Sequence, residues 1–183
     1  MTFKIEAAHP SLAFNASHFL SFPIAPGVWR AERLHSHDFR FSLVVESLLD
    51  ETECVVDFDA AMKAAKEVLK RWQYRILVPI RNPNIATREV SEKEFVLVVK
   101  ETVAVEGANA PTEETVERSI TGPKSDFLFL NATNSSTEII AARLLDEWLR
   151  ELKDSFGISR ESLTSVCVRL EETPGCSAIV SRP

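Results

Sequence analysis

Alternation of apolar and polar residues predicts two long strands in the first third of the chain. Over residues 12–20 every second position is apolar or histidine, the period expected of a strand buried on one face. A longer run, about residues 33–49, repeats this pattern with apolar or histidine side chains at most odd positions. Such a pattern is typical of an antiparallel sheet covered on one side. Between the two runs, residues 21–32 contain two prolines and a glycine and predict a loop.

Helical spacing replaces the two-residue period in two later segments. Apolar residues recur every three to four positions over about Asp59–Trp72 and again over about Ser136–Phe156, which predicts one amphipathic helix in each segment. Ser135 with Glu138 fits a capping box at the start of the second helix, and Gly157 is a natural stop at its end.

The remaining segments add strands. About Leu163–Glu171 and Ser177–Ser181 predict two closing strands, joined through a Pro-Gly turn. Between the helices, residues 79–124 contain two strand-like runs, Phe95–Val105 and Thr115–Thr121. We interpret this stretch as a hairpin inserted in the domain, because it has too few apolar residues for a core of its own.

The order of elements predicts an α+β fold: an antiparallel four-stranded sheet with two helices on one face, plus the inserted hairpin. A length of 183 residues fits a single domain, residues 1–183. A net charge of −6 argues against a general nucleic-acid binder. The three cysteines lack metal-knuckle spacing and favour a reducing, cytoplasmic location, and no apolar run is long enough for a membrane span.

Three of the four histidines fall on predicted strand faces that can meet. His35 and His37 are two apart and project from one face, and His18 lies near the end of the preceding strand on its apolar face. If the two strands pair, the three imidazoles can bind one metal with a fourth position open, the arrangement of a catalytic zinc. The alternative is a set of core or interface histidines held by hydrogen bonds.

Glu172 is a second unusual residue. The last long strand places Val166, Val168 and Leu170 on its inward face, and Glu172 follows in the same alternation. A carboxylate there either pairs with a ligand or turns out to solvent.

Several short segments, in order along the chain, resemble the motifs of the 6-pyruvoyltetrahydropterin synthase / 6-carboxytetrahydropterin synthase family. They are Phe14-Asn15-Ala16-Ser17-His18, His35-Ser36-His37-Asp38-Phe39, Val56-Asp57-Phe58, Asn134-Ser135-Ser136-Thr137-Glu138 and Glu171-Glu172-Thr173. Only residues 79–124 have no counterpart among these motifs.

The resemblance implies the tunnelling fold, in which subunits pair their sheets into barrels as trimers or hexamers. It implies a small pterin substrate, bound by Glu172 and Thr173. It also implies Zn²⁺ on His18, His35 and His37, holding the hydroxyls of the pterin side chain.

The proton-transfer residues of the family are absent. Ala31 stands where the family has its general-base cysteine, and Gln73-Tyr74 stands where it has an Asp-His pair. Glu32, three residues before His35, instead resembles a family variant in which a glutamate replaces the cysteine and the enzyme cleaves dihydroneopterin. The alternative for Glu32 is a loop residue in water. Tyr74 could donate a proton where the family uses histidine, or could be an aromatic packed beneath the insert.

The sequence therefore predicts a zinc-dependent lyase that acts on the side chain of 7,8-dihydroneopterin or its triphosphate, with Glu32 and Tyr74 as catalytic candidates. Retro-aldol cleavage to 6-hydroxymethyldihydropterin is the favoured reaction. The competing hypothesis is a catalytically inactive, zinc-containing pterin- or purine-binding protein of the same fold.

Overall fold

The computed structural model describes residues 1–105 and 112–183, which fall into two compact units. The first unit comprises Met1–Ala16, His37–Gln73 and Thr137–Pro183, and the second comprises Ser17–Ser36 and Tyr74–Ser136. Among the described residues no helix is both long enough and apolar enough to cross a membrane.

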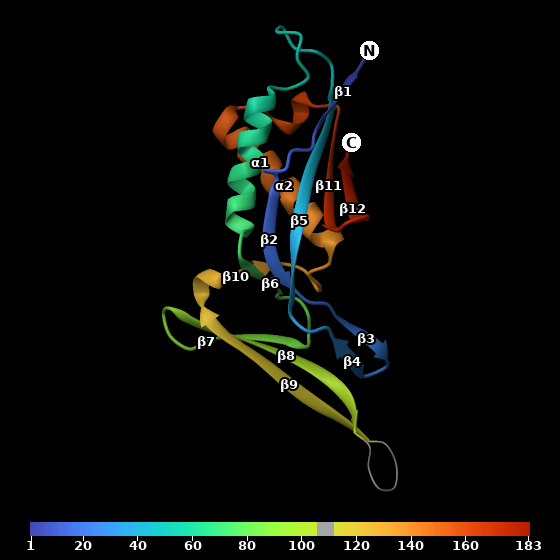
Figure 1. The fold of residues 1–183 in the computed structure, drawn as a ribbon, viewed down its shortest axis with the longest axis vertical. Helices are drawn as coiled ribbons and strands as arrows, with labels where there is room; N and C mark the ends of the chain where they lie inside the picture. The colour runs from blue at the N-terminus through green and yellow to red at the C-terminus, as the bar shows by residue number, and fades with distance from the viewer. Residues whose placement is uncertain (106–111) are drawn as a thin grey trace. The chain divides into compact units, whose positions relative to one another are not determined.

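An antiparallel sheet and two helices make up the first unit (Figure 1). It contains β1 (Phe3–Ala7), β11 (Ser165–Thr173), β12 (Cys176–Arg182) and most of β2 (Ala13–His18) and β5 (His35–Ser47). They are ordered β2-β5-β11-β12, and β1 pairs with the end of β5. The register of β11 on β5 sets Leu170 opposite Phe41 and Val168 opposite Leu43, so the inward residues of both strands face the same side.

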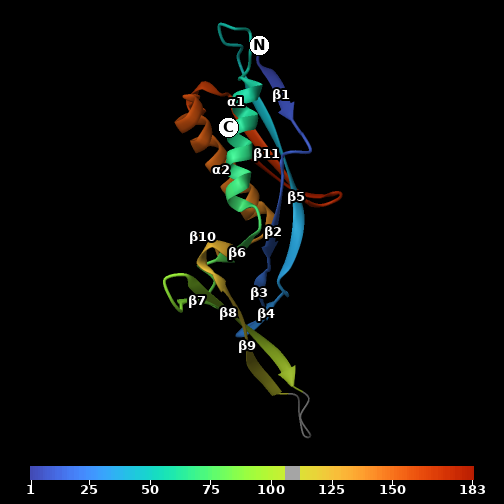
Figure 2. The ribbon, with the colours of Figure 1, turned by 60° about the vertical axis from the view of Figure 1, so that its left-hand side comes forward.

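Helices α1 (Phe58–Trp72) and α2 (Thr137–Phe156) cover one face of this sheet, as Figures 1 and 2 show. Each helix buries one tryptophan completely. The indole N–H of Trp72 donates to Glu147 at 3.1 Å, and that of Trp148 donates to the Ala61 carbonyl at 3.1 Å. Both buried indoles therefore satisfy their one polar group, and each bond links one helix to the other. A short 3-10 turn, η2 (Arg160–Ser162), precedes β11.

Strand β5 confirms the alternation that the sequence predicts. Phe39, Phe41, Leu43 and Val45 are buried, whereas the polar residues between them are exposed or half-buried. The observed helices also begin and end within one residue of the predicted ones.

Short ribbons and a three-stranded sheet form the second unit. An antiparallel ribbon joins β3 (Ser21–Ala25) to β4 (Val28–Ala31), and β6 (Arg75–Pro79) pairs in parallel with β10 (Phe127–Leu130). The sheet is ordered β7-β8-β9, with bounds Ile85–Glu89, Glu94–Val105 and Thr112–Pro123. A 3-10 turn, η1 (Lys124–Asp126), follows β9.

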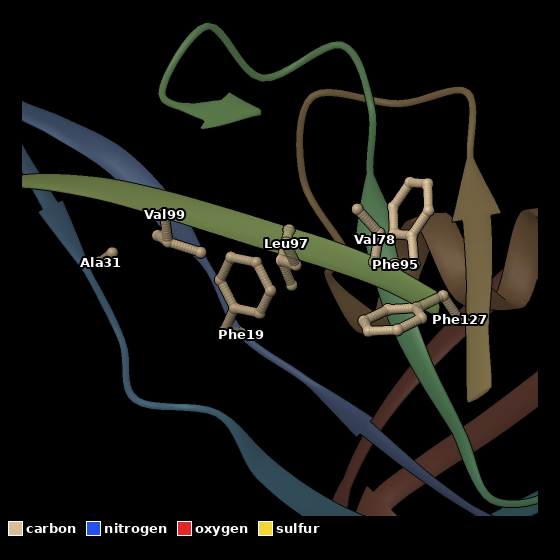
Figure 3. Close-up of a cluster of buried hydrophobic side chains, with 7 residues drawn as sticks. All are labelled: Phe19, Ala31, Val78, Phe95, Leu97, Val99 and Phe127. Carbon is tan, nitrogen blue, oxygen red and sulfur yellow. The ribbon is translucent and has the colours of Figure 1, made fainter. Parts of the chain in front are cut away.

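One apolar cluster joins the parts of the second unit (Figure 3). Its buried members are Phe19, Ala31, Val78, Phe95, Leu97, Val99 and Phe127. Three of these come from β8, and the other four lie outside residues 79–124. The inserted strands thus share a core with the chain around β4 and β6, as a segment with few apolar residues of its own requires.

Four sequence predictions need correction. Among the described residues the predicted four-stranded antiparallel sheet is a seven-stranded one, ordered β10-β6-β2-β5-β11-β12 with β1 paired to β5. It is mixed, because β6 and β10 run parallel. Residues 21–32 form the β3–β4 ribbon, where Gly27 takes a φ of 79° at the turn. The predicted hairpin at 79–124 has a third strand, β7, and residues 106–111 of that stretch lie outside the described chain. Helix α2 begins at Thr137, so Ser135 precedes the cap position, and its hydroxyl donates to the Phe19 carbonyl.

Asp57 caps α1, and its loss provides a test of local stability. Its carboxylate accepts from the amides of Asp59 at 2.8 Å and Ala60 at 3.4 Å. We expect Asp57→Ala to lower the free energy of unfolding by about 1 kcal/mol, because two amides of the first turn lose their acceptor. Urea denaturation at fixed protein concentration measures the change. Asp57→Asn keeps an acceptor oxygen and should lose much less; equal losses would contradict the capping role.

Candidate functional site

His18 ends β2 with its ring buried and its orientation set by a loop. Only 2% of the residue is exposed, and Nδ1 lies 2.8 Å from the Ser135 carbonyl oxygen. Ser135 is itself fully buried and donates its hydroxyl to the Phe19 carbonyl at 2.7 Å. Because a carbonyl can only accept, Nδ1 carries the ring proton in the neutral imidazole and the lone pair is on Nε2.

His35 opens β5 and is oriented in the same way. Its Nδ1 lies 2.8 Å from the Arg33 carbonyl oxygen, so this ring too has its lone pair on Nε2 when neutral. The ring centroids of His18 and His35 are 4.7 Å apart. Two backbone carbonyls therefore select the tautomer in which each ring offers Nε2 as a ligand.

His37 and Glu172 form a second pair. Nε2 of His37 lies 3.0 Å from Oε1 of Glu172, and Oε2 of Glu172 accepts from the hydroxyl of Thr137, the first residue of α2. The β11–β12 pairing shifts register at this residue, a bulge of the kind that redirects a side chain beside a site. Glu171 lies on the other face, 3.8 Å from Arg40, so strand alternation separates the two carboxylates as the sequence predicts.

Four side chains form a group that could hold one metal ion. His18, His35, His37 and Glu172 each offer one ligand atom, and these atoms all lie within 4.8 Å of one another. Imidazole nitrogens with a carboxylate oxygen are a donor set that suits zinc. The tautomers selected by Ser135 and Arg33 fit the same group, because a metal-bound histidine usually donates its other N–H to a carbonyl or carboxylate.

Comparison with known families gives the context of this site. The family model for 6-pyruvoyl tetrahydropterin synthase matches residues 9–183. The chain belongs to the 6-pyruvoyl tetrahydropterin synthase family. A search of curated proteins found no match.

Solved structures of 6-pyruvoyl tetrahydropterin synthases resemble the whole chain. The Plasmodium falciparum protein is 21% identical, with a TM-score of 0.76 over 99% of this chain and 98% of its own. A catalytic residue mutant of the Plasmodium vivax protein, glutamate to alanine, is 21% identical, with a TM-score of 0.77 over 100% and 98%. The Caenorhabditis elegans protein is 15% identical, with a TM-score of 0.52 over 100% and 97%. At these identities the likeness establishes the fold, which supports the tunnelling fold expected of a synthase of this family.

Two polar side chains near the histidines, Gln73 and Ser36, make hydrogen bonds that link neighbouring segments of the chain. Gln73 accepts from the Asn15 amide at 3.0 Å, so it ties the end of α1 to β2. Ser36, between the two histidines of β5, shares a 2.7 Å hydrogen bond with Ser17. Both side chains hold the backbone beside the histidines, and Gln73, unlike an aspartate, cannot act as a proton carrier.

Glu32 lies three residues before His35 along the chain and is held by two hydrogen bonds. Its amide donates to the Leu20 carbonyl at 2.8 Å, and its Oε2 accepts from the Leu20 amide at 3.1 Å. The residue is half-buried and lines a hollow of about 420 Å³ together with Arg33 and Arg118. These contacts do not support the alternative of a loop glutamate free in water.

Tyr74 and Thr173 are not part of the four-residue cluster. Tyr74 is 76% exposed with a φ of 60°, a left-handed conformation that is uncommon for a bulky residue. It is not packed beneath the insert, which was the alternative for this side chain. Thr173 is exposed at the end of β11, opposite Cys176.

The sequence suggested only a capping role for Ser135 and none for Thr137, whereas in the structure these residues contact His18 and Glu172. Both lie in the segment that resembles the family motif at the start of α2, so the signal was present. The contact of Ser135 with His18 spans 117 positions of the sequence, and that of Thr137 with Glu172 spans 35. No local sequence pattern can reveal contacts over such separations.

The four histidines of the chain allow a controlled test of the metal site. We expect the protein loaded with Zn²⁺ and desalted to retain about one ion per chain, and His18→Ala, His35→Ala or His37→Ala to lose most of it. His9→Ala is the matched control, because the His9 side chain is exposed, lies outside the cluster and hydrogen-bonds to Ser11. Elemental analysis measures the content. Retention by all three cluster variants, or equal loss in the His9 variant, would contradict the site.

Proposed function

We propose that this chain is a zinc-dependent lyase that cleaves the side chain of 7,8-dihydroneopterin or its triphosphate to 6-hydroxymethyldihydropterin. The observation that carries the proposal is Glu32, an ordered carboxylate three residues before His35, in a family member that has Ala31 in place of the usual cysteine. A glutamate is also the catalytic residue replaced in the P. vivax mutants, by alanine in one and by cysteine in another.

Recognition of the pterin ring falls to Glu172 and Thr173 in this proposal. A carboxylate accepts two N–H donors in parallel, and a pterin presents an amine beside a ring amide. Thr137 donates to one oxygen of Glu172 and orients it. The competing use of Glu172 is as a fourth metal ligand, which its 3.0 Å approach to His37 also allows.

His18, His35 and His37 would hold the zinc ion in this proposal. When bound there, zinc supplies a Lewis acid that makes the hydroxyls of the substrate side chain more acidic. The carbonyl groups of Ser135 and Arg33 then keep the rings of His18 and His35 in the ligating tautomer.

Glu32 starts the cleavage as the general base. It takes the proton of the 2′-hydroxyl, the O–H electrons form the new C2′=O bond, and the C1′–C2′ bond breaks with its electrons passing to C1′, conjugated with the pterin ring. C1′ then takes a proton, for which we propose Tyr74 as the donor. The products from dihydroneopterin are glycolaldehyde and 6-hydroxymethyldihydropterin, so neither an oxidant nor a reductant is required.

The second candidate is a catalytically inactive zinc-containing protein that binds a pterin or purine. It is favoured by the absence of the Asp-His pair and by the hydrogen bond that Gln73 makes in its place. In either case we propose a cytoplasmic homo-oligomer, a trimer or hexamer, as the family resemblance implies.

Removal of the Glu32 carboxylate tests the reaction. We expect Glu32→Gln to lower kcat for dihydroneopterin cleavage by about 10²–10⁴-fold, since a general base contributes that much, while zinc content and neopterin affinity stay unchanged. Release of 6-hydroxymethyldihydropterin is the assay. Glu92→Gln, an exposed carboxylate in the turn before β8, is the control. A wild type that binds neopterin but turns over no dihydropterin would favour the binding protein.

Two adjacent carboxylates test pterin recognition. We expect Glu172→Gln to weaken neopterin binding by roughly ten- to a hundredfold, because a charged hydrogen-bond partner is lost, and Glu171→Gln to change it little. Calorimetric titration measures both affinities, and zinc content is determined on the same samples. Loss of zinc in Glu172→Gln would instead make Glu172 a metal ligand, and equal effects of the two variants would contradict the assignment.

A further inference from the structure

Strands β8 and β9 hold the chain at the residue before Glu32. The amide of Trp29 in β4 donates to the Thr102 hydroxyl at 3.3 Å, and Nη2 of Arg118 in β9 donates to the Ala31 carbonyl at 2.9 Å. Ala31 is also buried in the apolar cluster with Leu97 and Val99 of β8, as Figure 3 shows. Strands β8 and β9 thus contact both the backbone of β4 and the side chain of its last residue, Ala31.

Arg118 is itself held in place by a charge. Its Nε lies 3.2 Å from Oε1 of Glu101, and the two side chains are only 27% and 18% exposed. Arg118 stands opposite Val99 in the register, so Glu101 is its diagonal neighbour, within reach of a long side chain. The guanidinium therefore forms an ion pair with the carboxylate on its Nε side and donates a hydrogen bond from Nη2 to the Ala31 carbonyl. A single ammonium group cannot reproduce this two-sided contact.

The carbonyl that Arg118 binds belongs to the same peptide group as the amide of Glu32. That peptide group is planar, with the oxygen and the N–H on opposite sides. Arg118 holds the oxygen, and the Leu20 carbonyl accepts from the N–H at 2.8 Å. The peptide plane is therefore clamped at both ends, and the Cα of Glu32 lies in that plane. The Leu20 amide then holds Oε2 of the side chain at 3.1 Å.

We propose that Arg118, supported by Glu101, is a positioning residue for Glu32. The clamp consists of the hydrogen bonds of Arg118 and Leu20 to the peptide group between Ala31 and Glu32. It fixes the direction of the Glu32 side chain, which lines the same hollow as Arg118. The consequence for catalysis rests on the proposed function, in which Glu32 is the base. The clamp itself is a property of the backbone and can be measured without turnover.

The decisive variant is Arg118→Gln, with Lys100→Gln as its matched control. Lys100 and Glu117 form an ion pair of 2.9 Å between the same two strands, one residue away in each, so the control removes a cation from β8–β9 without touching Ala31. We expect amide hydrogen exchange at Glu32 to become roughly tenfold faster or more in Arg118→Gln, because a charge-assisted bond is lost, and to stay unchanged in the control. Amides of α2 report any global loss of stability.

Kinetics provide the second measurement. We expect kcat of Arg118→Gln to fall by roughly ten- to a hundredfold with KM and zinc content unchanged, since a displaced base loses rate and leaves binding intact. Arg118→Lys should recover only part of the loss. If Arg118→Gln fails to fold, Glu101→Gln, which releases the guanidinium, takes its place.

The exchange data separate the two levels of the proposal. If the Glu32 amide exchanges at the same rate in Arg118→Gln as in the Lys100→Gln control, the clamp is contradicted, regardless of the measured activity. Faster exchange at Glu32 supports the clamp even in a protein without turnover, in which case the proposed function is what fails. Faster exchange with an unchanged kcat in an active enzyme overturns the positioning role.

Discussion

The two-residue period of β5 is the constraint on which the rest of the site depends. Its inward positions hold His35 and His37 and then the buried Phe39 and Phe41, so one strand face supplies both candidate metal ligands and core residues. A slip of one residue in register would move all of them to the other face. The helices that cover the face therefore also keep the histidines in place, because burial of the phenylalanines determines which way the imidazoles point.

Backbone carbonyls accept from two of the three imidazole rings and help to orient them. Ser135 and Arg33 each offer a carbonyl oxygen 2.8 Å from an imidazole Nδ1. A carbonyl selects the tautomer without adding negative charge beside the site. In the proposed function the two carboxylates have different roles, Glu32 toward a proton and Glu172 toward the ligand. The reaction that we propose requires two carboxylates with different roles, one as the general base and the other for recognition of the pterin.

Much of the fold and of the candidate site could be predicted from local periodicity. Alternation placed His18, His35, His37 and Glu172 on inward faces, and the structure brings these four side chains together, although their functions stay predictions. The β3–β4 ribbon was missed because prolines indicate a loop, whereas Pro23 is tolerated in a two-stranded ribbon that turns at Gly27. The contacts of Glu32 with Leu20, and the clamp from β9, join residues far apart in sequence and follow no period.

The central claim, retro-aldol cleavage by a base at Glu32, is tested most directly by the fate of the side-chain carbons. The zinc-loaded wild-type protein is incubated with 7,8-dihydroneopterin in D₂O, and the products are analysed by mass spectrometry and NMR. The account predicts glycolaldehyde and 6-hydroxymethyldihydropterin in equal amounts, with deuterium from the solvent on the hydroxymethyl carbon. A product that keeps all three side-chain carbons, or no product from a protein that binds neopterin, would contradict it.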